Sequence, residues 1–74
     1  MINNIDNFAV FQRRLGKMMD KHYYRKSRDL ADKANISYTN LMNYRYGRAQ
    51  PTLHNLIAIA DALNVSIDWL VGRK

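Results

Sequence analysis

Hydrophobic side chains recur at intervals of three and four in the first third of the chain, which is the period of an α-helix. Five residues fall on that one face: Phe8, Phe11, Leu15, Met18 and His22. The pattern predicts a helix over residues 6–21, with Asn4 or Asp6 as its N-terminal cap. Met19 lies beside this stripe and is expected to fill the core. Gly16 weakens a helix by about 1 kcal/mol relative to Ala, so its presence indicates close packing.

Two shorter helices are predicted in the middle of the chain. The first, over residues 27–34, has three residues on one apolar face: Leu30, Ala31 and Ala34. Asn35 tolerates the left-handed conformation that ends a helix, and Ser37 can cap a second helix over residues 38–45. Only three residues separate the two helices. So short a connection forces a sharp crossing, which is the helix-turn-helix arrangement.

A fourth helix is predicted over residues 53–63. Gly47 ends the helix before it, and Thr52, which follows Pro51, is a suitable N-terminal cap. The apolar residues of this segment trace a stripe with Ile59 beside it: Leu53, Leu56, Ile57, Ala60 and Leu63. We expect that stripe to face the core.

The last predicted helix is short and covers residues 67–71. Asn64 can end the helix before it in the left-handed conformation, Ser66 can cap it, and Gly72 closes it. Four residues here are expected to pack on the core: Val65, Ile67, Trp69 and Leu70. No segment has a convincing strand pattern. The sequence therefore predicts one all-α domain of five short helices over residues 1–74.

The positive charge of the chain is concentrated in its middle. The formal net charge is +6, with a balance of +1 over residues 1–20, +5 over residues 21–50 and zero over residues 51–74. A basic segment on a folded domain is typical of proteins that bind a polyanion. A soluble basic surface without a partner is the simpler interpretation of the charge taken alone.

From residue 27 onward the sequence resembles the lambda-repressor-like (Cro/repressor, or XRE) family of helix-turn-helix repressors. Four pieces at matching spacing carry the resemblance: LADKANIS, TNLMNYRYG, the single proline at position 51, and LIAIADALNVSIDWLVG. The resemblance implies bacterial or phage transcriptional control by a homodimer that binds a pseudo-palindromic operator in double-stranded DNA. It also implies that the segment VSIDWLVG forms the dimer contact, with Ile67 and Val71 as candidate residues.

The resemblance also assigns roles to single residues. The family's base-reading positions fall on Tyr38, Thr39 and Asn43, and Leu41 falls on the position that points into the core. The phosphate-binding positions fall on four residues: Ser27, Arg28, Tyr46 and Arg48.

Elementary chemistry supports these assignments. Residues 38, 39, 42 and 43 share the outward face of the helix opposite Leu41. Asn43 can bond adenine through two hydrogen bonds, Thr39 offers a hydroxyl or a methyl group, and Met42 can contact a thymine methyl. Lys26 and Arg28 at one end of the helix, and Arg48 at the other, would straddle the phosphates on either side of the groove.

Three positions depart from the family pattern. Asn35 stands where glycine is usual, although the left-handed turn is still accessible. Ser27 stands where glutamine usually grips a phosphate and braces the recognition helix, and serine is too short for both tasks. Asp20 and Arg45 stand where the family commonly has an arginine and a glutamate, so we expect the same ion pair with exchanged signs.

Residue content argues against other kinds of site. The chain has no Glu or Cys, no carboxylate near a plausible histidine base and no phosphate-cradling glycine loop, so it is not expected to be an enzyme. His22 and His54 lack ligand spacing, and no cofactor, metal or small-molecule ligand is expected. No apolar run approaches the roughly 18 residues that span a membrane. The N-terminus MINNIDNF lacks the layout of a signal peptide, so we expect a cytoplasmic protein.

Two other functions stay open at this point. Toxin-neutralising antitoxins and adaptors that bind other proteins use this same fold, and a fold alone does not determine function. Non-specific binding to nucleic acid or to an anionic membrane surface needs only the charge. The basic centre and the polar outward face favour sequence-specific binding of DNA over both.

Overall fold

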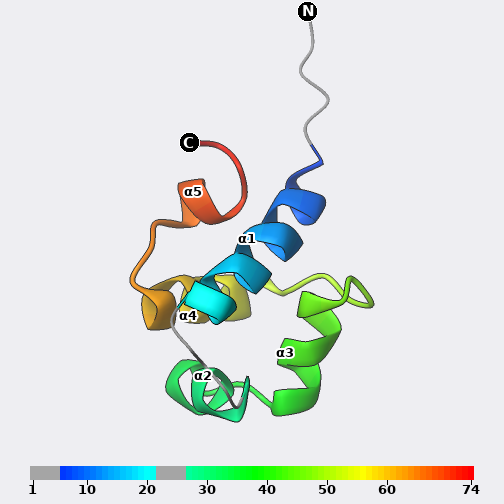
Figure 1. Cartoon of the computed structure of the whole chain (residues 1–74), viewed down its shortest axis with the longest axis vertical. Coiled ribbons are helices and arrows are strands. Elements are labelled where there is room, and N and C mark those ends of the chain that lie inside the picture. The colour runs from blue at the N-terminus through cyan, green and yellow to red at the C-terminus, as the bar shows by residue number, and fades with distance from the viewer. Residues whose placement is uncertain (1–5, 22–26) are drawn as a thin grey trace, which may run out of the picture.

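Five helices form the described part of the chain, residues 6–21 and 27–74, in the computed structural model (Figure 1). They are α1 (Asn7–Lys21), α2 (Ser27–Ala34), α3 (Tyr38–Arg45), α4 (Leu53–Leu63) and α5 (Ile67–Leu70). No strand occurs in these two ranges. The structure thus confirms the all-α prediction, with α1 beginning and α5 ending one residue inside the expected bounds.

Short polar side chains cap the helices as their positions in the sequence predict. Three residues accept the backbone N–H of the residue three positions later, at 3.0 or 3.1 Å: Ser37, Thr52 and Ser66. Asp6 does the same for α1, because its Oδ1 accepts the N–H of Ala9 at 3.1 Å. Each contact satisfies one of the backbone donors that a helix start leaves without a partner.

Two asparagines reverse the chain at helix ends. Asn35 has φ 57° and Asn64 has φ 58°, both in the left-handed region that the sequence predicted for them. After Asn35 the N–H of Ile36 donates to the carbonyl of Ala31 at 3.0 Å, which closes α2. The chain can then re-enter a helix at once, so α3 crosses α2 at the sharp angle of a helix-turn-helix unit.

The core lies where all five helices meet. α2 packs against α3 and α4, while α1 packs against α3 and α5. Figure 1 shows α1 running down the middle of the molecule, with α3 on one side of it and α5 on the other. The largest fully buried side chains come from every helix: Phe11, Leu15, Leu30, Leu41, Ile59 and Leu70. Met18 and Met19 are also buried, which confirms their expected role as core residues.

The apolar stripe predicted for α4 was wrong at two of its five positions, although Leu56 packs against the core as expected. Leu53 is 70% exposed and Ile57 is 39% exposed, whereas Ile59 and Ala62 are buried. Ala60 and Leu63 are buried as expected. α4 packs against both α2 and α5, so its later turns are buried by neighbours on more than one side. Periodicity alone does not reveal how far along a helix its neighbours extend.

Arg14 ties the first helix to the end of the chain. Its guanidinium donates to the backbone carbonyl of Trp69 and lies 4.8 Å from the centre of the Trp69 ring. A second hydrogen bond reaches the carbonyl of Lys74 at 3.3 Å. The positive charge of Arg14 is therefore used inside the fold, where it anchors the segment around α5 against α1.

Candidate nucleic-acid interface

Two buried side chains, the aliphatic Leu41 and the aromatic Tyr44, hold the inward face of α3 against the core. Leu41 is fully buried, as predicted, and Tyr44 is 4% exposed. The Tyr44 hydroxyl accepts a hydrogen bond from Nδ2 of Asn55 on α4 at 2.8 Å. Its ring meets the edge of Phe11 on α1, with ring centres 6.4 Å apart. These contacts fix both the position of α3 and its rotation about its own axis.

The outward face of α3 carries most of the residues predicted to read bases. Tyr38 and Thr39 are exposed, and Asn43 is half-buried one turn further along the same helix. Met42 is also half-buried, but it differs from these three because it packs against the core. Only part of the Met42 side chain is left to face a partner, so the outward face is more polar than the sequence suggested.

Arginine side chains lie at both ends of this outward face. At the N-terminal end, Arg28 of α2 is exposed, and its guanidinium lies 4.7 Å from the centre of the Tyr38 ring. The preceding residue, Ser27, is the first residue of α2 and is half-buried. Lys26, also predicted to contact phosphate, lies outside the described residues.

At the C-terminal end of α3 the chain turns back on the helix. Gly47 has φ +75°, which only glycine adopts without strain, and the next residue, Arg48, folds over Asn43. Arg48 Nε donates to Asn43 Oδ1 at 2.9 Å. Tyr46 is 57% exposed, and its ring centre lies 5.5 Å from the Arg45 guanidinium and 5.4 Å from that of Arg48. Two cations thus stack around one exposed aromatic ring.

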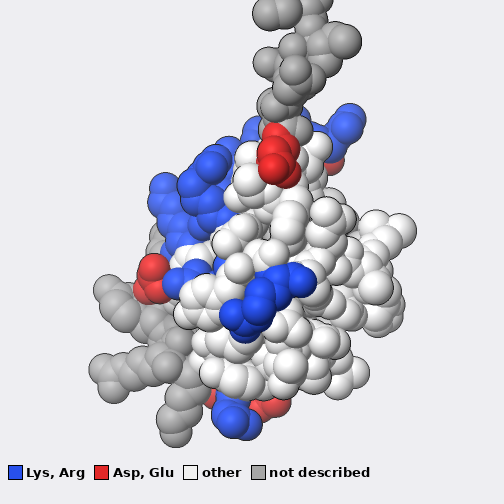
Figure 2. Space-filling view, turned by 90° about the vertical axis from the view of Figure 1, so that its right-hand side faces the viewer, with Lys and Arg blue, Asp and Glu red and all other residues white. Residues whose placement is uncertain are grey.

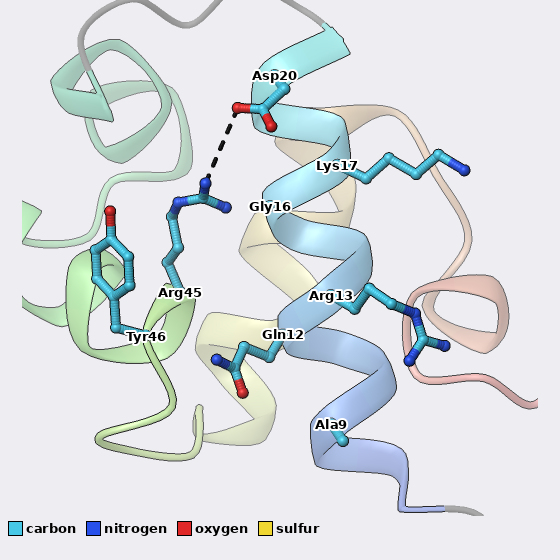
Figure 3. Close-up of a pocket in the computed structure, with 8 residues that line it drawn as sticks. All are labelled: Ala9, Gln12, Arg13, Gly16, Lys17, Asp20, Arg45 and Tyr46. Atoms are coloured by element: carbon cyan, nitrogen blue, oxygen red, sulfur yellow. Dashed lines mark ion pairs between the residues drawn. The ribbon is translucent and has the colours of Figure 1, made fainter.

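The ion pair with exchanged signs is present between α1 and α3. Arg45 Nη2 lies 3.9 Å from Asp20 Oδ1, and the Asp20 side chain is 79% exposed. Figure 3 shows the Arg45 guanidinium between the two helices, directed toward Asp20. A Cβ atom on Gly16 would lie 3.2 Å from Arg45 Cζ. Glycine therefore leaves the space that the guanidinium occupies, which confirms that Gly16 marks close packing.

Two further basic residues border the same region but were not predicted as site residues. Arg13 and Lys17 of α1 are exposed, and with Arg45 they line an open hollow of about 460 Å³. Figure 3 shows both side chains pointing to the other side of α1, away from Arg45. Their spacing of four residues places them on one helical face. That spacing could have predicted a basic face on this helix, but the low net charge of residues 1–20 concealed it.

Among the described residues, the basic side chains around α3 lie in separate groups. Figure 2 looks onto the side of the molecule where α3 lies in Figure 1 and shows Lys and Arg in separate groups with uncharged surface between them. Such a layout suits a partner whose negative charges are spaced apart, with neutral hydrogen-bonding groups between them. The phosphates and base edges of duplex DNA are arranged in this way.

The two residues predicted for a dimer contact are only partly accessible. Ile67 is half-buried and packs against the core. Val71 is half-buried, and its backbone carbonyl accepts a hydrogen bond from Asn7 Nδ2 at 2.6 Å. Among the described residues, the large aliphatic side chains that are exposed to solvent are Leu53 and Ile57 of α4.

The described ranges lack the features of two other kinds of protein, membrane-spanning and metal-binding. Residues 6–21 and 27–74 contain no helix long and apolar enough to cross a membrane. Within the same residues, no three His, Cys, Asp or Glu side chains come together in a group that would hold a metal ion.

Comparison with known proteins agrees with this geometry. The family described as helix-turn-helix matches residues 12–70, which is most of the chain. The matched range includes α2, α3, α4 and α5 and the last two thirds of α1. No solved structure matches the chain significantly.

Two curated relatives are similar to this chain. One is the cryptic phage CTXphi transcriptional repressor RstR of Vibrio cholerae, which is 50% identical over 44 residues that cover 60% of this chain and 39% of the relative. The other is an uncharacterised helix-turn-helix-type transcriptional regulator of Haemophilus influenzae. It is 32% identical over 71 residues, which cover 96% of this chain and 28% of that protein. The chain thus spans less than half the length of each relative.

Proposed function

Because this chain belongs to the helix-turn-helix family of the lambda-repressor-like type, we propose that it binds duplex DNA sequence-specifically and represses transcription. α3 enters the major groove with its outward face toward the bases. The observation that carries the proposal is the outward face itself: hydrogen-bonding side chains lie in its middle, and an arginine lies at each end. Since the partner is genomic or phage DNA, the protein acts in the cytoplasm.

The chemistry of the outward face suits the major groove. An α-helix fits this groove, where each base pair presents its own pattern of donors and acceptors. Asn43 and Thr39 supply an amide and a hydroxyl group for those patterns, and Tyr38 reaches a base edge or a phosphate. Arg28 and Tyr46 contact phosphates at the two ends of the helix, which position the protein without reading sequence.

Membership of the helix-turn-helix family agrees with the expectation that the domain is not an enzyme. Repression is preferred to activation because the relative that is 50% identical is named a transcriptional repressor. The basic side chains around α3 and the polar face of α3 both favour DNA over a protein partner.

The protein binds its operator as a homodimer. One recognition helix reads only a few base pairs, and two copies on one face of the duplex would read half-sites about 34 Å apart. Ile67 and Val71 are the proposed contact residues, and Leu53 and Ile57 are the alternative that their exposure offers. Sedimentation of the variants Val71→Asp and Leu53→Asp on a palindromic duplex distinguishes the two contacts. Only the substitution that lies in the dimer contact should reduce the number of protomers bound per site. One protomer per site at saturation for the unmodified protein would contradict the dimer.

Base reading is tested with a duplex that the protein selects from random DNA and with a scrambled duplex of the same composition. Asn43→Ala should weaken binding to the selected duplex by about 1–3 kcal/mol and affect the scrambled duplex much less. Thr39→Ala should behave in the same way. Arg28→Ala should weaken both complexes similarly and lower the slope of the log affinity against log salt by about one.

The ratio of the two affinities decides the outcome. If Asn43→Ala and Thr39→Ala both left this ratio unchanged, α3 would not read bases. A protein-binding adaptor on the same fold would then be the better hypothesis, and capture of a neighbouring-gene product would be its test.

A further inference from the structure

Arg48 is bound to a base-reading side chain, although the sequence suggested only a phosphate contact for it. Its Nε–H donates to Asn43 Oδ1 at 2.9 Å, and the two residues are joined once more through the backbone. The N–H groups of Arg48 and Ala49 both donate to the carbonyl of Asn43, at 2.8 and 3.3 Å. The side-chain bond is therefore built on a backbone turn that already brings the two residues together.

The position of the Arg48 side chain has a clear structural cause. Gly47 adopts φ +75° and turns the chain back over the last turn of α3. The guanidinium then lies against the exposed Tyr46 ring, 5.4 Å from its centre, on one side. A planar guanidinium with this stacking contact is held in one orientation more easily than a flexible ammonium group would be. The Nε–H is thereby directed at Asn43.

An asparagine amide has two orientations that differ by exchange of its oxygen and nitrogen. Recognition of adenine needs both groups in one order, because Oδ1 accepts from the N6 amino group and Nδ2 donates to N7. A donor beside Oδ1 favours one orientation, since Nδ2 in that place would put two donors face to face. Oδ1 has two lone pairs, so the bond from Arg48 leaves it able to accept from a base as well.

We propose that Arg48 is a positioning residue that sets the orientation of the Asn43 amide and so determines which base Asn43 prefers. This inference rests on the proposed function, in which Asn43 reads a base. The guanidinium has five N–H groups, and the bond to Asn43 uses only the one on Nε, which leaves the four on the terminal nitrogens for other contacts. They contact a backbone phosphate in the complex, so one side chain couples a phosphate contact to base recognition.

The test compares Arg48→Met and Arg48→Lys on the selected and the scrambled duplex. Arg48→Met removes both the donor and the charge, so it should weaken both complexes. It should also lower the ratio of the two affinities by about two- to tenfold, the range for one hydrogen bond. Arg48→Lys keeps the charge and should preserve binding to scrambled DNA within about twofold, yet still lower the ratio.

A double-mutant cycle with Asn43→Ala shows whether Arg48 changes the affinity ratio through the Asn43 amide. In the Asn43→Ala background, Arg48→Met should no longer change the ratio, because no amide is left to orient. The loss of preference should also be confined to the one base pair of the selected duplex that Asn43→Ala affects. Arg73→Met is the matched control: this arginine is exposed near the C-terminus, and its replacement should leave the ratio unchanged.

Nuclear magnetic resonance of the free protein gives a readout that does not involve DNA. The Asn43 Nδ2 group should become more mobile on the picosecond-to-nanosecond timescale in Arg48→Met. The Asn55 amide, which donates to the Tyr44 hydroxyl, should not change and serves as an internal reference.

The outcomes separate this inference from the proposed function. If Asn43→Ala lowers the affinity ratio while both Arg48 variants leave it unchanged, base reading stands and the positioning role is wrong. If Asn43→Ala itself leaves the ratio unchanged, the positioning role is wrong, and base reading by α3 is wrong with it if Thr39→Ala also leaves the ratio unchanged. A fall in the ratio for Arg48→Met that persists in the Asn43→Ala background would also overturn the positioning role, because Arg48 would then act on the DNA directly.

Discussion

α3 and α4 both leave side chains in solvent, but the exposed groups differ in chemistry. On α3 they are polar or amphipathic, from Tyr38 at its start to Asn43 near its end, and each of these two residues is in contact with an arginine. On α4 they include the aliphatic residues Leu53 and Ile57. The buried faces differ less, since Leu41 on one helix and Ile59 on the other are both fully buried.

The difference shows that exposure alone does not identify a binding face. Exposed aliphatic side chains are normal on protein surfaces and gain nothing from a hydrated, charged partner. Exposed amide, hydroxyl and guanidinium groups, arranged along one helix, match the donors and acceptors of a DNA groove. α3 therefore separates its two tasks by face: the inner face supplies stability, and the outer face is available for binding.

The largest effect is expected from Leu41→Ala compared with Leu53→Ala. Leu41 is fully buried on α3, so its truncation leaves a cavity and should lower the free energy of unfolding by about 2–5 kcal/mol. Leu53 is 70% exposed on α4, and the same change there should stay within about 0.5 kcal/mol. Urea denaturation followed by circular dichroism measures both. Equal losses at the two positions would remove the distinction between the faces.

A smaller effect is expected from the tyrosine that joins the two helices. Tyr44→Phe removes the acceptor for Asn55 Nδ2 and should lower the free energy of unfolding by about 1 kcal/mol. Tyr46→Phe is the matched control, because Tyr46 is 57% exposed and its hydroxyl should not affect stability. Binding to scrambled DNA should respond in the opposite way, with a loss only for Tyr46→Phe. A stability loss at Tyr46 would show that it belongs to the fold instead.

The smallest effect is expected from the ion pair between α1 and the end of α3. Asp20 is 79% exposed and 3.9 Å from Arg45, so a double-mutant cycle should give a coupling under about 1 kcal/mol. Asp20→Arg combined with Arg45→Glu restores the family's usual signs and should recover much of this coupling. The coupling should shrink further in 1 M salt, because exposed charges are screened. Strict additivity of the single changes would mean that the pair contributes nothing.

Much of the backbone was predictable because its signals are local. Ser37, Thr52 and Ser66 each cap the helix that follows through a contact three residues away, so the sequence contains both partners. Asn35 and Asn64 adopt left-handed backbone conformations that few other residues tolerate. The core position of Leu41 followed from its place as the only aliphatic residue that faces away from the polar side of a short helix.

The side-chain environment of the candidate site depended on contacts between distant segments. No periodicity indicates that Leu53 and Ile57 stay exposed, because burial depends on how far the neighbouring helices extend along α4. The open hollow that Arg13 and Lys17 line together with Arg45 requires α1 and α3 to pack side by side. The bond from Arg48 to Asn43 requires the Gly47 turn in three dimensions. The sequence by itself thus determined where the helices begin and end and which residues α3 offers, because hydrogen bonds between near neighbours control both. Only the tertiary structure decided which of those residues are buried, exposed or held by an arginine, because those outcomes depend on helices that are far apart in the chain.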